Sequence, residues 1–162
     1  MTNFLHPELA GDDDAPAGFR ARSLRLGVRA GCERLGAGLY ELGPGEAVCP
    51  YHWHAANEEL LLVVAGSPSL RTPAGWRELA AGDVVSFRVG EAGAHQIANR
   101  GEQPVRVIVF SQMRRPEVCS YPDSGKVMSY GGRPGDAGDP DAFAHMFRVA
   151  DEVGYWDGEK AP

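Results

Sequence analysis

Two histidines placed two residues apart carry the clearest sign of chemistry in this sequence. They are His52 and His54, in the stretch Tyr-His-Trp-His. Alternate side chains of a β-strand point to the same face, so both imidazoles would project together while Tyr51 and Trp53 point away. Two imidazoles side by side on one face suit a metal ion, and the spacing therefore predicts a pair of metal ligands.

Further ligands can come from two other segments. A carboxylate, Glu58 or Glu59, follows a short turn after His54, and His95 follows a glycine-rich turn. Three imidazoles and one carboxylate suit Fe, Mn, Ni, Co, Cu or Zn, whereas Ca and Mg prefer oxygen ligands alone. We therefore expect one divalent transition metal ion, with two octahedral positions left for water, dioxygen or a chelating substrate.

The segments that must position these side chains read as short strands separated by turns. Strand candidates lie around residues 24–26 and at 35–42, 51–54, 58–65, 69–71, 76–79, 83–87, 95–99 and 105–110. Such spacing is typical of an all-β sandwich or barrel, and the 21 glycines and 12 prolines supply the turns. Residues 60–64 and 105–110 are nearly continuous apolar runs, as expected for strands buried on both faces, inside a barrel or under a second subunit.

The two ends of the chain read differently from this middle part. Residues 1–22 contain a polar stretch without periodicity, which predicts an N-terminal arm. Residues 131–140 are rich in glycine, proline and aspartate and predict a flexible linker. Beyond it, Phe143, Met146 and Phe147 have helical spacing and Asp141 is placed to cap a short helix, which would have to dock on the barrel or on a partner.

The predicted ligands and the glycines before and after them resemble the two sequence motifs of the cupin superfamily. The resemblance covers roughly residues 30–113. The first motif is Gly45, six residues, His-Trp-His, four residues, Glu59, six residues and Gly66. The second is Gly82, five residues, Arg-Val-Gly at 88–90, four residues, His95, three residues and Asn99. The sequence departs from the family pattern in one longer gap after Gly45, in an Arg where Pro is usual, and in two extra residues before His95.

The resemblance implies a fold, a site and a range of activities. The fold would be a cupin-type double-stranded β-helix, a jelly-roll barrel at residues 23–115, followed by a C-terminal extension at 116–162. The metal ligands would be His52, His54, Glu59 and His95, because the six-residue gap to Gly66 favours Glu59. Glu58 is then the candidate catalytic group.

The activity would be metal-dependent chemistry on a small polar molecule, as a dioxygenase or like the sugar-phosphate isomerases with which small cupins are often grouped. A non-catalytic module that binds a small molecule through the metal is the alternative. No cluster of Lys or Arg beside the ligands marks a phosphate site, although Arg106 or Lys126 could approach in the fold.

The composition of the chain indicates which kinds of partner the protein can bind. The 162 residues carry 22 acidic and 16 basic side chains, for a net charge of −6, which weakens any nucleic-acid interpretation. The longest apolar run is far too short to cross a bilayer, and three scattered cysteines read as cytosolic thiols, so we expect a cytoplasmic protein. The apolar strands and a dockable tail predict a homodimer.

Overall fold

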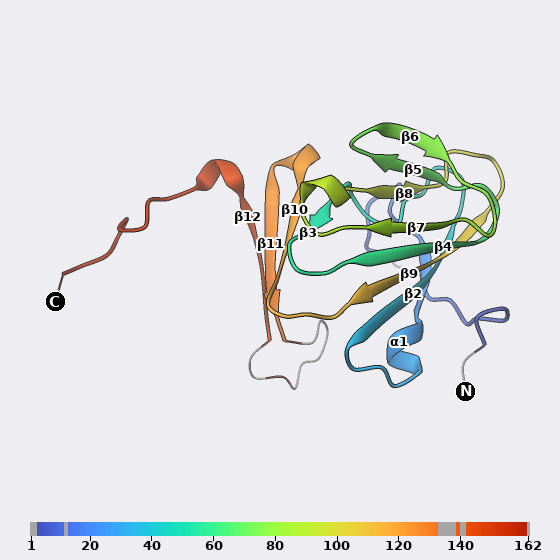
Figure 1. Cartoon of the computed structure of the whole chain (residues 1–162), viewed down its shortest axis with the longest axis horizontal. Coiled ribbons are helices and arrows are strands. Elements are labelled where there is room, and N and C mark those ends of the chain that lie inside the picture. The colour runs from blue at the N-terminus through green and yellow to red at the C-terminus, as the bar shows by residue number, and fades with distance from the viewer. Residues whose placement is uncertain (1–2, 12, 133–138, 140–141, 162) are drawn as a thin grey trace.

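The computed structural model describes residues 3–11, 13–132, 139 and 142–161 and is built almost entirely of β-strands (Figure 1). The strands are β1 (Arg22–Arg25), β2 (Leu35–Leu42), β3 (Trp53–His54), β4 (Glu59–Ala65), β5 (Ser69–Thr72), β6 (Gly75–Glu78), β7 (Val84–Phe87), β8 (Gln96–Ala98), β9 (Val105–Gln112), β10 (Glu117–Tyr121), β11 (Lys126–Gly131) and β12 (Phe143–Arg148). The short helix α1 (Leu26–Arg29) and the 3-10 turns η1 (Glu91–Gly93), η2 (Pro122–Ser124) and η3 (Val149–Asp151) complete the described elements. Each strand predicted within the first 113 residues corresponds to a strand of the structure. The spacing of the turn residues therefore predicted these strands well.

The strands form three antiparallel sheets. The order is β1-β2-β9-β4-β7 in the largest, β6-β5-β8 in the second and β12-β11-β10-β3 in the third. The first two sheets lie at opposite sides of the barrel, and the third lies at one end of it (Figure 1). Non-consecutive neighbours, such as β9 between β2 and β4, are the crossovers of a double-wound jelly roll.

The hydrophobic core lies between the two barrel sheets. Its centre is made by Leu61 and Val63 of β4, Leu70 of β5, Ile97 of β8 and Val107 of β9, all nearly inaccessible to solvent. A second cluster covers the other face of the five-stranded sheet, where Leu24, Leu39 and Ile108 pack with Leu62 and Val64. The continuous apolar runs of β4 and β9 are thereby explained, because each strand is apolar on both faces, as predicted.

One glycine of the first motif is fixed by this packing. Gly66 directly follows β4 and has a φ of +78°, a conformation that residues other than glycine rarely adopt. A Cβ atom there would lie 2.8 Å from Cγ1 of Val105 and 2.9 Å from the carbonyl oxygen of Pro104. The motif position therefore serves the close approach of β4 to β9.

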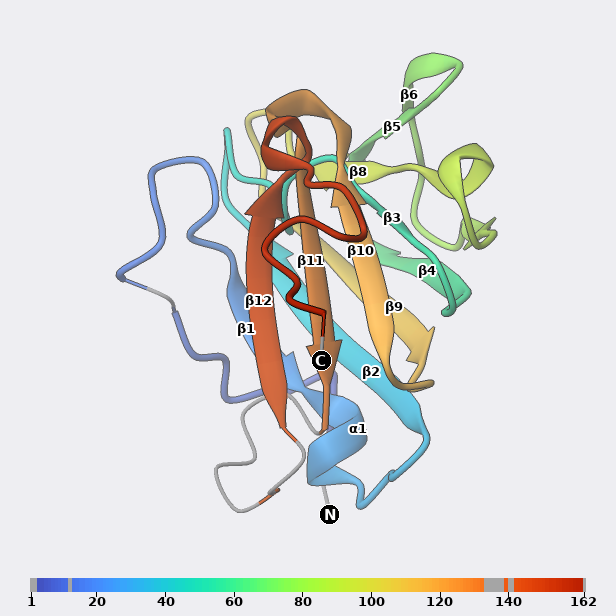
Figure 2. The ribbon, with the colours of Figure 1, turned by 90° about the vertical axis from the view of Figure 1, so that its left-hand side faces the viewer.

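The C-terminal part of the chain returns to the barrel. β10 pairs with β3, with Cys119 opposite His54 and Ser120 opposite Trp53. Figure 2 shows β10, β11 and β12 side by side, and residues 117–121 thus form one wall beside the predicted metal ligands. The division of the chain at residues 22 and 115 stays a prediction, but the strand partner of His54 comes from the extension.

The helix expected after residue 141 is wrong. Residues Phe143–Arg148 form strand β12, which pairs with β11 from Lys126↔Arg148 to Gly131↔Phe143. A six-residue helix is marginal in water, whereas pairing with β11 gives the backbone its hydrogen bonds at once. The proposed cap Asp141 and most of the predicted linker lie outside the described residues, and Gly131 itself ends β11.

The N-terminal residues run beside β1. Ala10 and Ser23 exchange backbone hydrogen bonds of 2.9 and 2.8 Å, and Leu9 packs on the outer cluster. No helix within the described ranges is long and apolar enough to span a membrane.

Candidate metal centre

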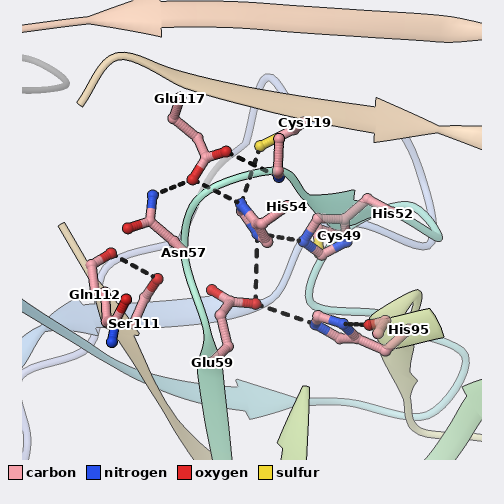
Figure 3. Close-up of polar contacts among 12 residues, drawn as sticks. Cys49, His52, His54, Asn57, Glu59, His95, Ser111, Gln112, Glu117 and Cys119 are labelled. Atoms are coloured by element: carbon pink, nitrogen blue, oxygen red, sulfur yellow. Dashed lines mark hydrogen bonds and ion pairs between the residues drawn. The ribbon is translucent and has the colours of Figure 1, made fainter. Parts of the chain in front are cut away.

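The side chains of the four predicted ligands point toward one another (Figure 3). His52 precedes β3 and faces His95, and the two residues exchange backbone hydrogen bonds of 3.1 and 2.9 Å. His54 ends β3, and Glu59 begins β4, with the turn at 55–57 between them. The strand alternation predicted for His52 and His54 therefore brings both rings to the same point.

The ligand atoms lie within contact distance of one another. Nε2 of His52 is 3.1 Å from Nε2 of His54, which is 3.4 Å from Oε2 of Glu59. The same carboxylate oxygen is 3.2 Å from Nε2 of His95. His52 and His95 are buried, and the side chains of His54 and Glu59 are only 12% and 11% exposed.

The hydrogen bonds of the outer ring nitrogens fix which atoms face the centre. Nδ1 of His52 lies 3.0 Å from the carbonyl oxygen of Pro50, and Nδ1 of His95 lies 2.9 Å from that of Gly93. A carbonyl only accepts, so these contacts assign the proton to Nδ1 and leave Nε2 with its lone pair directed inward. Imidazole nitrogens grouped with one carboxylate are the donor set that a divalent transition metal ion prefers, so this arrangement fits such an ion.

The charge states differ among the three close side chains. Burial, followed by the neighbouring imidazoles of His95 and His54, lowers the pKa of His52 to about 4. Burial also disfavours the charged form of His54, but hydrogen bonds to Cys119 and Glu59 outweigh it and raise its pKa to about 10. Burial likewise opposes ionisation of Glu59, yet the His54 and His95 imidazoles beside its carboxylate keep its pKa well below the usual range. Without an ion, the site therefore holds its positive charge on His54.

Glu58 and Glu59 point to different sides of the chain. The Glu59 carboxylate contacts His54 and His95, whereas Glu58 is exposed and its backbone oxygen accepts a hydrogen bond from Gln112 N–H at 3.1 Å. The structure thus brings together His52, His54, Glu59 and His95 and leaves Glu58 outside the cluster. Metal binding by the four, and a catalytic role for Glu58, stay predictions.

Neighbouring residues of the two motifs have structural roles. The Asn99 side chain donates to the carbonyl oxygens of Leu42 and Gln103 at 3.0 and 2.9 Å, as expected for a residue that satisfies backbone groups. Sγ of Cys49 is 3.5 Å from Nδ1 of His52, and burial raises the pKa of this thiol to about 12. The Phe87 ring stacks on His95 at 3.6 Å between centroids and 5° between planes, which holds that imidazole flat against the core.

The residues behind His54 were not predicted from the sequence. Sγ of Cys119 lies 3.1 Å and Oε2 of Glu117 lies 3.8 Å from Nδ1 of His54. Glu117 is fully buried, and its carboxylate accepts backbone hydrogen bonds of 3.0, 3.1 and 2.8 Å from Ala55, Ala56 and Val118. These residues follow the second motif, and only the alternation of residues 117–121 could have marked them as a strand.

Asn57 and Tyr121 complete this wall of the site. The Asn57 amide donates to Glu117 and, at 3.1 Å, to the carbonyl oxygen of Arg114, while its own oxygen accepts from Arg114 N–H at 2.8 Å. The Tyr121 ring stacks on His52 with 6.0 Å between centroids. The turn that separates His54 from Glu59 is therefore tied to β10 from several directions.

Comparison with known proteins agrees with this geometry. Residues 38–111 match the cupin domain family, which confirms the resemblance seen in the two motifs. All four predicted ligands fall within the matched residues. No curated protein matches the chain significantly.

Three solved structures share the fold. A protein from Acidithiobacillus ferrooxidans, provisionally named a sugar phosphate isomerase, is 26% identical with a TM-score of 0.73, and the match covers 84% of this chain and 81% of that one. A sugar phosphate isomerase of the cupin superfamily from Silicibacter pomeroyi is 24% identical with a TM-score of 0.75, over 97% and 98% of the two chains. The polyketide cyclase RemF from Streptomyces resistomycificus is 21% identical with a TM-score of 0.56, over 67% and 77%.

Proposed function

We propose that this protein is a metal-dependent cupin enzyme that binds one divalent transition metal ion through His52, His54, Glu59 and His95. The observation that carries the proposal is the convergence of ligand atoms: those of His52, His54 and Glu59 all lie within 4.8 Å of one another, and His95 contacts the same carboxylate. The substrate would be a small polar molecule with two oxygens that can bind side by side.

A bound ion would hold and polarise substrate oxygens as a Lewis acid. The protein's own part is to keep the four ligands in place. Backbone carbonyls orient His52 and His95, the Cys119 and Glu117 side chains orient His54, and the Phe87 and Tyr121 rings keep water from two of the imidazoles. Such prior orientation lowers the cost of ordering a site when it binds its ion and substrate.

Isomerisation of a sugar phosphate is the first reaction class to test, because two similar structures bear that name. Of the two cations considered for the phosphate, Arg106 is paired with Glu41 at 2.6 Å. Lys126 is the better candidate, since its Nζ lies 5.9 Å from the centre of the Tyr121 ring, which in turn stacks on His52. Dioxygenase chemistry is the second class, and it requires a redox-active ion such as iron.

A non-catalytic binding module is the alternative to an enzyme. The exposure of Glu58 favours it, because the candidate general base does not contact the cluster and a base must lie within hydrogen-bond reach of the proton it removes. Turnover with neither a sugar phosphate nor dioxygen, together with tight metal-dependent binding of a small carboxylate or sugar, would support the binding module.

The deciding experiment is elemental analysis of untagged protein purified without chelators, alongside His54→Ala. We expect about one transition metal ion per chain in the wild type and loss of most of it in the variant, because three donors hold an ion more weakly than four. The free energy of unfolding of the metal-free protein should change much less, since the barrel core is separate from the site. Equal metal content in both proteins would refute the assignment.

The metal so identified then separates the reaction classes. Iron-loaded protein that consumes dioxygen with a candidate substrate would be a dioxygenase, whereas aldose–ketose interconversion without oxygen uptake would mark an isomerase. We also propose that the protein is a homodimer, and the cytoplasmic location stays a prediction.

A further inference from the structure

The C-terminal residues 149–161, here called the tail, leave the body of the protein after β12 (Figures 1 and 2). Val149 N–H donates to the carbonyl oxygen of Gly125 at 2.9 Å, but later backbone hydrogen bonds found in the described part of the tail are local, such as Asp157 to Gly154 and Glu159 to Trp156. The tail ends in an extended position without packing on the barrel (Figure 1).

This tail carries an unusual pair of exposed aromatic side chains. Tyr155 is 85% and Trp156 is 76% exposed, and their rings contact each other edge to face at 4.5 Å. A buried aromatic side chain of this size removes roughly 150–250 Å² from water. Tryptophan and tyrosine are enriched among the residues that carry binding energy between proteins, so this pair is suited to anchor the tail on another surface.

An apolar groove lies on the outer face of the five-stranded sheet. Leu35 of β2, Leu60 of β4 and Phe110 of β9 line it, together with polar residues such as Ser86, and its volume is about 440 Å³. Leu35 and Leu60 are 49% and 39% exposed, although the next outward residues of β4 are covered by the outer cluster. The groove is therefore an uncovered continuation of an otherwise covered apolar face.

We infer that the tail of one copy docks in this groove of a second copy, and that the exchange is reciprocal. The inference rests on the proposed homodimer and names the surfaces that form it. Four exchanged aromatic side chains would bury roughly 600–1,000 Å², and the groove surface beneath them about as much again, which reaches the 1,200–2,000 Å² of a stable interface. A reciprocal exchange also closes under two-fold symmetry, so no filament results.

The charges of the two surfaces are complementary. The tail has four acidic side chains and one basic one: Asp151, Glu152, Asp157, Glu159 and Lys160. Three exposed arginines flank the lining residues of the groove in the sequence, namely Arg34, Arg88 and Arg114, against two exposed acidic residues, Glu33 and Glu58. The second glutamate of the lining, Glu59, turns its carboxylate to the histidine cluster. Opposite charges around an apolar contact favour the correct partner and speed association.

The first test is sedimentation equilibrium of the full-length chain and three variants at micromolar concentration. The double variant Tyr155→Ser/Trp156→Ser removes the aromatic anchors, and Leu35→Glu places a charge in the groove. Each should weaken dimerisation by roughly 30-fold or more, as loss of a buried interface anchor does. Trp76→Ser is the matched control, because it removes a partly exposed tryptophan of β6, far from both surfaces, and should leave the dimer unchanged.

The second test mixes the two defective variants. The Leu35→Glu copy keeps its tail and the double variant keeps its groove, so their mixture restores one of the two contacts and should form a heterodimer tighter than either homodimer. Circular dichroism of each variant checks that it is folded. A heterodimer no tighter than the homodimers would overturn the inference and would indicate a tail that docks on its own chain.

The outcomes of these tests distinguish the tail exchange from the homodimer proposed above. A wild-type monomer would refute both the homodimer and the tail exchange. A dimer that tolerates the double variant and Leu35→Glu would refute the tail exchange alone. Neither outcome bears on metal content, which tests the candidate centre independently.

Discussion

At the scale of single residues, the centre depends on how each imidazole is held. His52 and His95 each use a backbone carbonyl two residues away along the chain, so the local sequence orients them. His54 instead relies on Cys119 and Glu117, more than sixty residues away. The ligands could therefore be predicted from the motif spacing, whereas the support of His54 could not, because nothing in the sequence records which distant strand pairs with β3.

The choice between the two adjacent carboxylates can be tested directly. Glu59→Gln removes the negative charge that faces His54 and His95, so it should abolish stoichiometric metal binding. Glu58→Gln changes an exposed side chain and is the matched control, with unchanged metal content. Calorimetric titration of chelator-treated protein with Zn²⁺ or Mn²⁺ measures both, and an empty site in the Glu58→Gln variant alone would contradict the assignment.

Glu117 is predicted to act on the metal through His54. In Glu117→Gln, one amide oxygen can still accept the three backbone N–H groups, but the charge beside Nδ1 of His54 and the hydrogen bond from the Asn57 amide are lost. Metal affinity should fall by about 10–100-fold, as is typical when the partner of a ligating histidine is removed. The Co²⁺ absorption spectrum of the variant should shift as well, which a purely structural role of Glu117 would not cause.

Val118→Thr is the control for this variant, since Val118 is partly exposed on the same strand. If affinity and spectrum stay at wild-type values in Glu117→Gln while only the melting temperature falls, then Glu117 serves the fold and does not position His54.

At the scale of elements, the strands up to β9 follow from alternation and turn residues, but those after Pro116 do not. The expected helix failed because Phe143, Met146 and Phe147 satisfy the helical spacing while the backbone pairs with β11, a long-range contact that no local pattern reports. The turn before β8 also departs from the family pattern, and the 3-10 turn η1 accommodates its extra residues. Sequence patterns thus predicted local structure and missed pairing across the sheet.

The η1 turn gives a prediction of its own. A Cβ atom at Gly93 would lie only 1.7 Å from the carbonyl oxygen of Arg88, so Gly93→Ala must displace the turn whose Gly93 oxygen holds His95. We expect a loss of about 1–3 kcal/mol in the free energy of unfolding, as for other overpacked sites, together with weaker metal binding. Urea denaturation and metal titration measure the two effects.

Gly101→Ala is the matched control, because a Cβ there meets its nearest neighbour at an ordinary 3.5 Å. A Gly93→Ala protein as stable as Gly101→Ala would mean that the turn yields more easily than its contacts indicate.

At the scale of the whole molecule, the ion should stabilise a fold that does not require it. The core between the sheets contains no predicted ligand, so the metal-free protein should remain folded. An ion present at 100 times its dissociation constant adds about 2.7 kcal/mol of stability. For a domain of this size that corresponds to a rise of roughly 5–10 °C in melting temperature.

Thermal unfolding with and without EDTA measures this difference. The His54→Ala protein should melt at the same temperature in both conditions, since it has little ion to lose. A wild-type protein that unfolds outright in EDTA would show that the barrel depends on the metal.

The pairing of β10 with β3 has a consequence for where this protein can be divided. Residues 38–111 match the cupin domain and hold every expected ligand, yet Glu117 and Cys119 stand beyond that limit. A fragment limited to residues 38–111, or a graft of those residues into another barrel, would contain the three histidines. It would lack Glu117 and Cys119, which orient His54. The smallest transplantable unit of this centre therefore ends after Tyr121, and engineering that respects only the family boundary would cut through it.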